Sequence, residues 1–296
     1  MEEMVYNVFH KLEWGLLIAM YFYFTGLSAG TFVISSMATV MGMEKYKPLA
    51  KYAALLAFLL LGSVPFLLIL DLGQPLRFWH IMVPTYFHVT SVIAWGTLLL
   101  SLYPILCFIY AFYLWIKPEE KKIIRTLGMI GVPLAIAVHA YTGFIFGVIK
   151  SRAFWYTALQ PAYFLASAFV SGFGLMMLVT LLLNKYGSEE TKKAISKSLV
   201  YDMGRILSYI LAVDFFFVVS QILITLHGNV ESVLAVTFAL KDPIYLWGEI
   251  VAGLIIPYII LVLPRTKRNL SWVTVAAVLV LIGVAFVRWS IVHIGQ

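Results

Sequence analysis

The sequence predicts an all-α integral membrane protein in which eight transmembrane helices pack as a bundle. Of its 296 residues, 62% are hydrophobic and only 12% are charged, and the mean hydropathy is +0.95, whereas soluble domains carry about 25% charged residues. Because unpaired backbone groups are not tolerated in lipid, such a chain spans the membrane as helices or as a closed barrel. Its apolar runs are long and continuous, unlike the short alternating segments of barrel strands. We therefore expect helices.

Eight stretches reach the length of about 20 mostly apolar residues that a transmembrane helix needs. In chain order they cover about residues 13–42, 48–70, 88–116, 125–149, 154–183, 205–227, 243–263 and 271–293. The connections are short except for the charged stretch 184–204, for which we expect a short surface helix. The chain, 1–296, then forms one transmembrane domain with both termini on the same side of the membrane.

Lysine and arginine are distributed unequally between the two ends of these spans. The end that holds both termini has five, with Arg288 a sixth near it: Lys11, Arg77, Lys150, Arg152 and Lys241. The other end has fifteen: Lys45, Lys47, Lys51, Lys117, Lys121, Lys122, Arg125, Lys185, Lys192, Lys193, Lys197, Arg205, Arg265, Lys267 and Arg268. Since loops rich in these residues stay in the cytoplasm, we expect a multi-pass protein of the cell (inner) membrane with extracytoplasmic termini. The net charge of +7 is explained in this way without a nucleic-acid partner.

Histidine shows the opposite distribution. All six histidines lie at or toward the outer end of the spans, and the basic loops contain none: His10, His80, His88, His139, His227 and His293. We therefore expect any chemistry on the outer side. The single cysteine, Cys107, excludes an intramolecular disulfide and an all-cysteine iron–sulfur or zinc site within this chain, and we expect no metal in it.

The stretch LDLGQPLRFWHIMVP, residues 70–84, is a sharp polar break between two apolar spans. Asp71 and Pro75 suit a capped turn that leads into a short helix. The amphipathic residues that follow, Arg77, Phe78 and Trp79, are typical of a membrane interface. One interpretation is a structural turn, and the other is a rigid edge on which a peripheral subunit docks.

Four ionisable residues, Asp214, Glu249, Arg288 and His139, lie away from the ends of the predicted spans. Such intramembrane side chains are functional candidates by default. Asp214 is near the middle of its span, so it is protonated, paired or next to water, and both a hydrogen bond between helices and a proton relay would explain it. Glu249 and Arg288 either form a buried ion pair, which is weak support for stability, or line a polar cavity on a proton path. His139 either bonds a neighbouring helix or belongs to a functional site.

Five motifs, taken together and in order, resemble the NrfD/PsrC family, the membrane subunits of polysulfide reductase-like molybdoenzyme complexes. They are YFYFTGLSAGTF, LDLGQPLRFWHIM, YTGFIFGVIKSRAFW, QPAYFLASAFVSG and LWGEIVAGLIIP, and the resemblance covers essentially the whole chain. In DLGQP, Gln74 stands where the family usually has arginine. At Tyr21 some members have histidine.

The resemblance implies a haem-free subunit that binds menaquinone or ubiquinone near the outer face, between the first helix and the outer ends of helices two to four. Tyr141 resembles the tyrosine that contacts the quinone head, with His139, Tyr21, Trp14 and Asp71 completing the pocket. Electrons would pass to or from a ferredoxin-like iron–sulfur subunit, and through it a molybdopterin catalytic subunit. This partner would dock at Arg77, Phe78 and Trp79, and the remaining surroundings would be membrane lipid. Protons would move through Asp214, Glu249 and Arg288.

Two other classes remain open from the residues alone. A b-type cytochrome subunit would hold haem between paired histidines on neighbouring helices, since all six lie toward one side. An ion-coupled secondary transporter would use the intramembrane Asp214, Glu249 and Arg288, although the sequence shows no inverted repeat.

Overall fold

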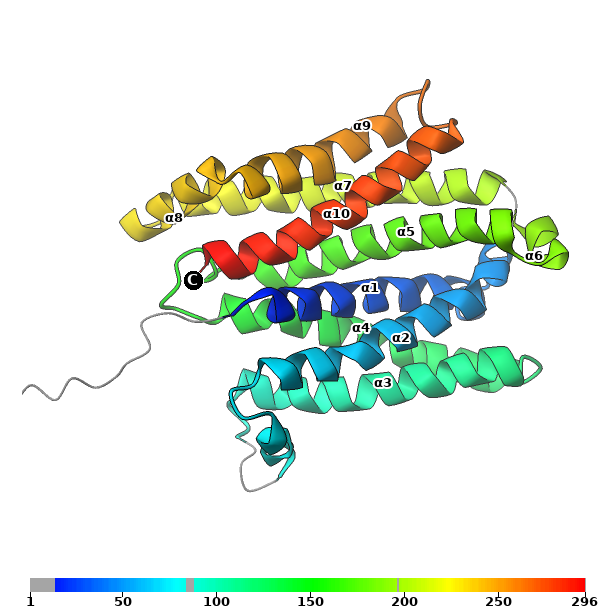
Figure 1. Ribbon diagram of the computed structural model, residues 1–296, viewed down its shortest axis with the longest axis horizontal. Helices are drawn as coiled ribbons and strands as arrows, with labels where there is room; N and C mark the ends of the chain where they lie inside the picture. The colour runs from blue at the N-terminus through cyan, green and yellow to red at the C-terminus, as the bar shows by residue number, and fades with distance from the viewer. Residues whose placement is uncertain (1–13, 84–87, 196, 296) are drawn as a thin grey trace, which may run out of the picture.

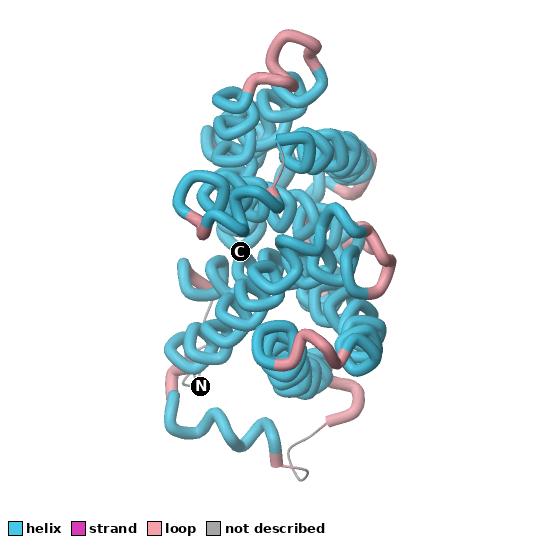
Figure 2. The backbone as a smooth tube through the Cα atoms, turned by 90° about the vertical axis from the view of Figure 1, so that its right-hand side faces the viewer, coloured by secondary structure: helices cyan, strands magenta, loops and turns pink. Residues whose placement is uncertain are grey.

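All eight expected spans are helices in the computed structural model, which describes residues 14–83, 88–195 and 197–295. Their ranges are α1 Leu16–Thr39, α2 Lys47–Asp71 with the short η1 Glu44–Tyr46 before it, α3 Val92–Ile116, α4 Lys121–Gly147, α5 Gln160–Tyr186, α7 Lys197–Leu226, η4 Ile244–Ile255 continued by α9 Ile256–Val262, and α10 Leu270–Ile294. No strand occurs among the described residues (Figures 1 and 2). His10 and Lys11 lie outside them. The expected all-α transmembrane bundle is confirmed.

The spans form two groups of four. α1, α2, α3 and α4 pack in a closed ring, and α5, α7, α9 and α10 pack in a second ring. α1 and α4 join the two rings by packing against α5, and α1 also contacts α10. In Figure 1 the blue α1 lies at the centre of the molecule between α2 and the red α10. Each ring of helices encloses a cavity of its own, described below.

α1 is rich in small and hydroxyl-bearing residues, which let other helices pack closely around it and bury it. Gly30 meets Gly172 of α5 so closely that a Cβ on Gly30 would lie 2.7 Å from the Gly172 Cα, which is how small residues let transmembrane helices approach. The hydroxyl of Ser28 donates to Ala57 O at 2.8 Å and that of Ser35 to Ala50 O at 2.7 Å. These bonds satisfy buried polar groups and tie α1 to α2.

Two helices outside the spans differ from expectation. Within 184–204 the surface helix is only α6, Glu189–Ala194, because Lys197 already begins the long α7. A further helix, α8, Val230–Lys241, occupies a connection that we expected to be short. Asn229 caps it by accepting a hydrogen bond from the Ser232 N–H at 2.9 Å. Its 12 residues are too few to span the membrane, so its length and apolarity do not mark it as a transmembrane helix.

The first ring and the second connect through a non-helical turn, 148–159. The predicted fifth span, 154–183, wrongly included its second half, residues 154–159. α5 begins at Gln160 with Pro161 in its first turn, a position that suits proline. The backbone of Pro161 packs against Gly143 of α4, where a Cβ would lie 2.5 Å from the Pro161 Cα. Gly143 therefore marks a close contact between α4 and α5, whereas Gly147 faces the turn, where a Cβ would lie 2.9 Å from Thr157 O.

The ends of the chain meet at one end of the bundle, around the indole of Trp155. Trp14 stacks on Trp155 with ring centroids 5.6 Å apart. Gly295 lies against Nε1, Cε2 and Cδ1 of the Trp155 indole, which a Cβ at residue 295 would overlap. Trp155 also donates from Nε1 to Ile291 O at 2.6 Å. Short η2, Pro75–Met82, and α8 lie at this end too (Figure 1).

Candidate functional site

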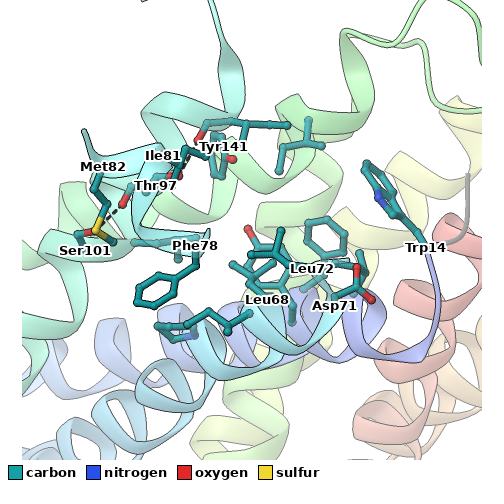
Figure 3. A pocket seen from close by; sticks show the side chains of 18 residues that line it. Trp14, Leu68, Asp71, Leu72, Phe78, Ile81, Met82, Thr97, Ser101 and Tyr141 are labelled. Carbon is teal, nitrogen blue, oxygen red and sulfur yellow. Dashed lines mark hydrogen bonds between the residues drawn. The ribbon is translucent and has the colours of Figure 1, made fainter. Parts of the chain in front are cut away.

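A largely apolar cavity of about 330 Å³ lies inside the first ring, at the end of the bundle where α1 begins. Its walls come from α1, the end of α2, η2 and the facing parts of α3 and α4. This volume falls within the range of small-molecule sites. Four of the five residues expected to bind quinone line it: Trp14, Tyr21, Asp71 and Tyr141. Figure 3 shows the cavity with Trp14, Asp71 and Tyr141 spread around it.

The polar side chains of the cavity fall into two classes. Thr97 and Ser101 donate their hydroxyls to carbonyls of their own helix, Thr97 to Ile93 O at 3.0 Å and Ser101 to Thr97 O at 2.7 Å. By contrast, no hydrogen bond to another described residue engages the side chain of Tyr21, Tyr141 or Asp71. An apolar pocket with a few uncommitted polar groups is typical of a site that orients a ligand.

Gly96 of α3 sets the position of Tyr141. A Cβ at residue 96 would overlap the phenol group of Tyr141. The phenol therefore lies directly against the α3 backbone at Gly96, where no side chain blocks it. Gly96 was not singled out from the sequence, because a glycine in an apolar run does not by itself indicate what it faces.

η2 closes the cavity on one side and faces outward on the other. Phe78 lines the cavity and is 40% exposed, while Arg77 and Trp79 are exposed on the outside of the segment. The expected short helix after Pro75 is thus present. The structure places Phe78 in the cavity wall and leaves Arg77 and Trp79 on the surface.

His139 does not line this cavity. Residues two apart lie about 200° around a helix axis, so His139 faces the second ring when Tyr141 faces the first. His139 Nε2 lies 2.7 Å from Phe164 O and 3.3 Å from Arg288 Nη2. These contacts need opposite states of Nε2, since the carbonyl requires a hydrogen there and the guanidinium requires a lone pair.

Arg288 is the centre of a second, fully buried polar cluster. Its Nη2 donates to Ser167 Oγ at 2.6 Å and to Phe164 O at 3.3 Å, and its guanidinium carbon lies 4.1 Å from the centre of the Phe164 ring. Nε and Nη1 have no hydrogen-bond partner within the described ranges. Among those residues Arg288 also forms no ion pair, so the expected alternative of a buried pair with Glu249 is not formed.

Glu249 and Asp214 face a small cavity beside this cluster. Tyr163 donates its hydroxyl to Glu249 Oε1 at 3.0 Å, whereas Glu249 Oε2 and Asp214 Oδ1 are buried without a partner in the part of the chain that the structure describes. The cavity they line with Tyr163 measures about 10 Å³, about the space of one water molecule. The backbone of η4, which carries Glu249, has π-helical hydrogen bonding, a feature frequent at functional sites.

Phe164 separates the two polar regions. Its phenyl group packs on those of Phe22 and Phe146, which belong to the first ring of helices, with centroids 5.8 Å and 5.6 Å apart. On the side of the second ring of helices it contacts Arg288 and His139. Tyr163, Phe164 and Ser167 were not singled out from the sequence. The spacing of Tyr163 and Ser167, four residues apart in an apolar helix, is the signal that would have indicated a polar stripe.

Comparison with known proteins shows which family the sequence resembles. A model of the family described as "Polysulphide reductase, NrfD" matches residues 4–296. The sequence is 30% identical to the Hdr-like menaquinol oxidoreductase integral membrane subunit of Archaeoglobus fulgidus, across 97% of this chain and 72% of that protein. It is 28% identical to a subunit of the selenate reductase of Mesobacillus selenatarsenatis, across 95% and 73%. It is 27% identical to a chain of the polysulfide reductase of Wolinella succinogenes, across 97% and 96%.

Proposed function

The chain belongs to the NrfD polysulphide reductase family, and from this premise we propose that it is the haem-free, quinone-reactive membrane subunit of a multi-subunit oxidoreductase. The relatives are named as subunits or chains of oxidoreductases, and one is named a menaquinol oxidoreductase subunit. A redox role within a membrane complex follows from the family. The quinone site and the partner are our proposal.

One observation carries the quinone site: the uncommitted polar groups of Tyr21, Tyr141 and Asp71 face a mostly apolar cavity of about 330 Å³. Menaquinone and ubiquinone each have a flat ring with two carbonyl oxygens and an apolar tail, so these residues fit the group. Quinol oxidation supplies two electrons and two protons. Tyr141 and Tyr21 would donate hydrogen bonds to the two ring oxygens, and Trp14 would form part of the apolar wall. Asp71, which is only half-buried, would accept the two protons one after the other and release each to water.

Electrons leave through a partner in this proposal. The chain has one cysteine, and no group of three or more metal-ligating side chains occurs among the described residues. The partner is a ferredoxin-like iron–sulfur subunit, linked to a molybdopterin catalytic subunit. It docks beside the cavity at the outside of η2, where Arg77 offers a charge and Trp79 an exposed ring, with Phe78 between the docking surface and the quinone. In this proposal η2 and both termini lie on the extracytoplasmic side, which the fifteen basic residues of the opposite end favour.

The buried cluster supports a second part of the proposal, proton movement through the bundle. Asp214, Glu249 and Arg288 come from three helices of the second ring, and each has at least one buried polar atom without a partner in the described ranges. Buried polar groups that lack partners are rare in proteins. His139, whose Nε2 lies within hydrogen-bond distance of both Phe164 O and Arg288 Nη2, connects this cluster to α4.

The proton path is tested with Asp214→Asn, which keeps the size of the side chain and removes the acid. In proteoliposomes that contain the whole complex, we expect proton movement per quinol oxidised to fall while quinol oxidation persists. Ser63→Ala, in α2 and remote from the cluster, serves as the control. Unchanged proton movement in Asp214→Asn would contradict the relay.

The quinone site is tested with Tyr141→Phe, which removes only the hydroxyl. We expect weaker binding of a soluble menaquinone analogue, measured by quenching of tryptophan fluorescence in the purified protein, and slower quinol oxidation by the complex. Loss of one hydrogen bond of about 0.5–1.5 kcal/mol predicts roughly a 2- to 12-fold weaker affinity. Tyr156→Phe, at an exposed tyrosine outside the cavity, is the matched control. Equal affinities for both variants would refute the site.

The cytochrome alternative requires two facing histidines inside the bundle. His139 is the one buried histidine in the described ranges, and its Nε2 contacts Phe164 O and Arg288. A visible absorption spectrum of the purified protein decides the matter, since a sharp Soret band would establish the cytochrome. Substrate uptake into liposomes by this protein alone would establish the transporter.

A further inference from the structure

A second large cavity lies at the opposite, basic end of the molecule, and nothing in the proposed function uses it. It measures about 380 Å³ and lies between the first turns of α7 and the end of α9 with the loop that follows it. Unlike the quinone cavity, its lining is mainly polar. Three cations line it: Arg205, Lys267 and Arg268.

The positive charge of this cavity is not cancelled by its one carboxylate. Asp202 lines it too, but its oxygens are already paired with Lys45 at 2.8 Å and with Arg205 at 3.3 Å. Neither Lys267 nor Arg268 has a carboxylate within ion-pair distance in the described part of the chain. The cavity therefore presents an excess of cations to any molecule that enters it.

The loop that supplies two of these cations is held in place. Tyr201 donates its hydroxyl to Arg268 O at 2.8 Å, and Thr266 donates its hydroxyl to Ile260 O at 2.6 Å. At the floor of the cavity Gly204 lets α9 approach, since a Cβ there would lie 3.3 Å from Leu261 Cδ2. The cations are thus presented by an ordered backbone rather than by a free tail.

The surface next to the cavity indicates what kind of anion fits. From Arg205 an exposed apolar stripe continues along α7 through Tyr209, Val213 and Phe216, which are 65%, 50% and 64% exposed. Their spacing of three to four residues places them on one face of the helix. A polar, cationic recess at the end of an apolar stripe matches a phospholipid, whose phosphate is charged and whose acyl chains are apolar. A free phosphate would use only the recess.

We propose that the recess between α7 and α9 binds the headgroup of an anionic phospholipid, with the phosphate held by Arg205, Lys267 and Arg268 and the acyl chains along Tyr209, Val213 and Phe216. Basic recesses between transmembrane helices are suited to such headgroups. A guanidinium pairs with phosphate oxygens through two parallel hydrogen bonds. The inference does not depend on quinone binding at the other end of the molecule.

The test is a lipid titration of the full-length protein in non-ionic detergent, followed by native mass spectrometry. Phosphatidylglycerol is compared with phosphatidylcholine, which has the same phosphate but no net charge. The variant Lys267→Gln/Arg268→Gln removes two exposed cations and keeps polar side chains at both positions. Lys121→Gln/Lys122→Gln removes two exposed cations from the start of α4 at the same end of the molecule, and serves as the matched control.

We expect phosphatidylglycerol to bind at least tenfold more tightly than phosphatidylcholine. Each basic residue near an anionic headgroup contributes a factor of about five, so the Lys267→Gln/Arg268→Gln variant loses about 25-fold in affinity for phosphatidylglycerol. The control stays within twofold of the unmodified protein. Equal losses in the two variants, or equal binding of the two lipids, would overturn the proposal.

A thermal-shift series separates the lipid from a free anion. We expect phosphatidylglycerol to raise the unfolding temperature of the unmodified protein and inorganic phosphate to leave it unchanged at millimolar concentration. Stabilisation by inorganic phosphate as large as that by the lipid would show a site for free anions and overturn the assignment to lipid.

Discussion

Replacing Gly96 with alanine isolates the contact that positions Tyr141 in the proposed quinone cavity. The new methyl group would overlap the phenol ring of Tyr141. Because carbon atoms in contact lie about 3.5–4.0 Å apart, the phenol ring must move by about 2 Å. We therefore expect Gly96→Ala to displace the hydroxyl from the cavity while leaving the helices in place.

The size of the effect follows from packing and hydrogen bonding. Overpacking a close-packed interior costs about 1–3 kcal/mol of stability. Loss of one hydrogen bond to the ligand weakens binding by roughly 2- to 12-fold. We expect Gly96→Ala to lower the unfolding temperature of the detergent-solubilised protein and to raise the KM for quinol in the complex within that range. Gly62→Ala is the control, since a Cβ at Gly62 of α2 meets nothing within 4 Å.

A double-mutant cycle shows whether the effect acts through Tyr141. In a Tyr141→Ala background the ring is absent, so adding Gly96→Ala should cost almost nothing further, and the two changes should be coupled by about 1–3 kcal/mol. The reasoning would be refuted if Gly96→Ala lowered stability equally in the two backgrounds, or if Gly62→Ala raised the quinol KM as much as Gly96→Ala.

Three further expectations concern stability, each measured as the free energy of unfolding in detergent. Trp155→Phe removes the indole donor from a buried α10 carbonyl and should cost about 1–3 kcal/mol; no loss would mean that water replaces the bond. Gly253→Val places a side chain against the backbone of Gly283 and should cost about 1–3 kcal/mol or prevent insertion, whereas a neutral result would show that η4 and α10 separate freely. Lys45→Gln breaks the exposed pair with Asp202 and should change stability by less than about 1 kcal/mol, and a larger loss would indicate that the pair holds the loop after α1 in place.

Much of the fold was predictable because each transmembrane span is a continuous apolar stretch of sequence, which can be identified without knowing the rest of the fold. Length and apolarity identified all eight spans, and the errors concern their ends and the segments between them. Residues 154–159 are apolar but belong to a turn. α8 has only 12 residues. The charged first turns of α7 were assigned to the surface segment 184–204, although Leu199, Val200 and Met203 are buried there.

The candidate site was predicted in part, and the reason lies in the direction of side chains. The resemblance to the family gathered Trp14, Tyr21, Asp71 and Tyr141, which do line one cavity. It also assigned His139 to that group, although a two-residue offset on a helix turns a side chain to nearly the opposite face. His139 contacts Arg288, 149 positions away in the sequence, and no local pattern contains that information.

By itself, the sequence determined the number of spans, the basic end of the molecule and the positions of its intramembrane polar residues, because apolarity and charge belong to each segment separately. Only the tertiary structure decided that these residues form two sites rather than one, that Phe164 stands between them, and that α7 and α9 enclose a cationic recess. The physical reason is that each site is assembled from helices far apart in the chain, so its composition depends on which helix faces meet. Packing determines those faces through close approaches such as Gly30 with Gly172 and Gly253 with Gly283.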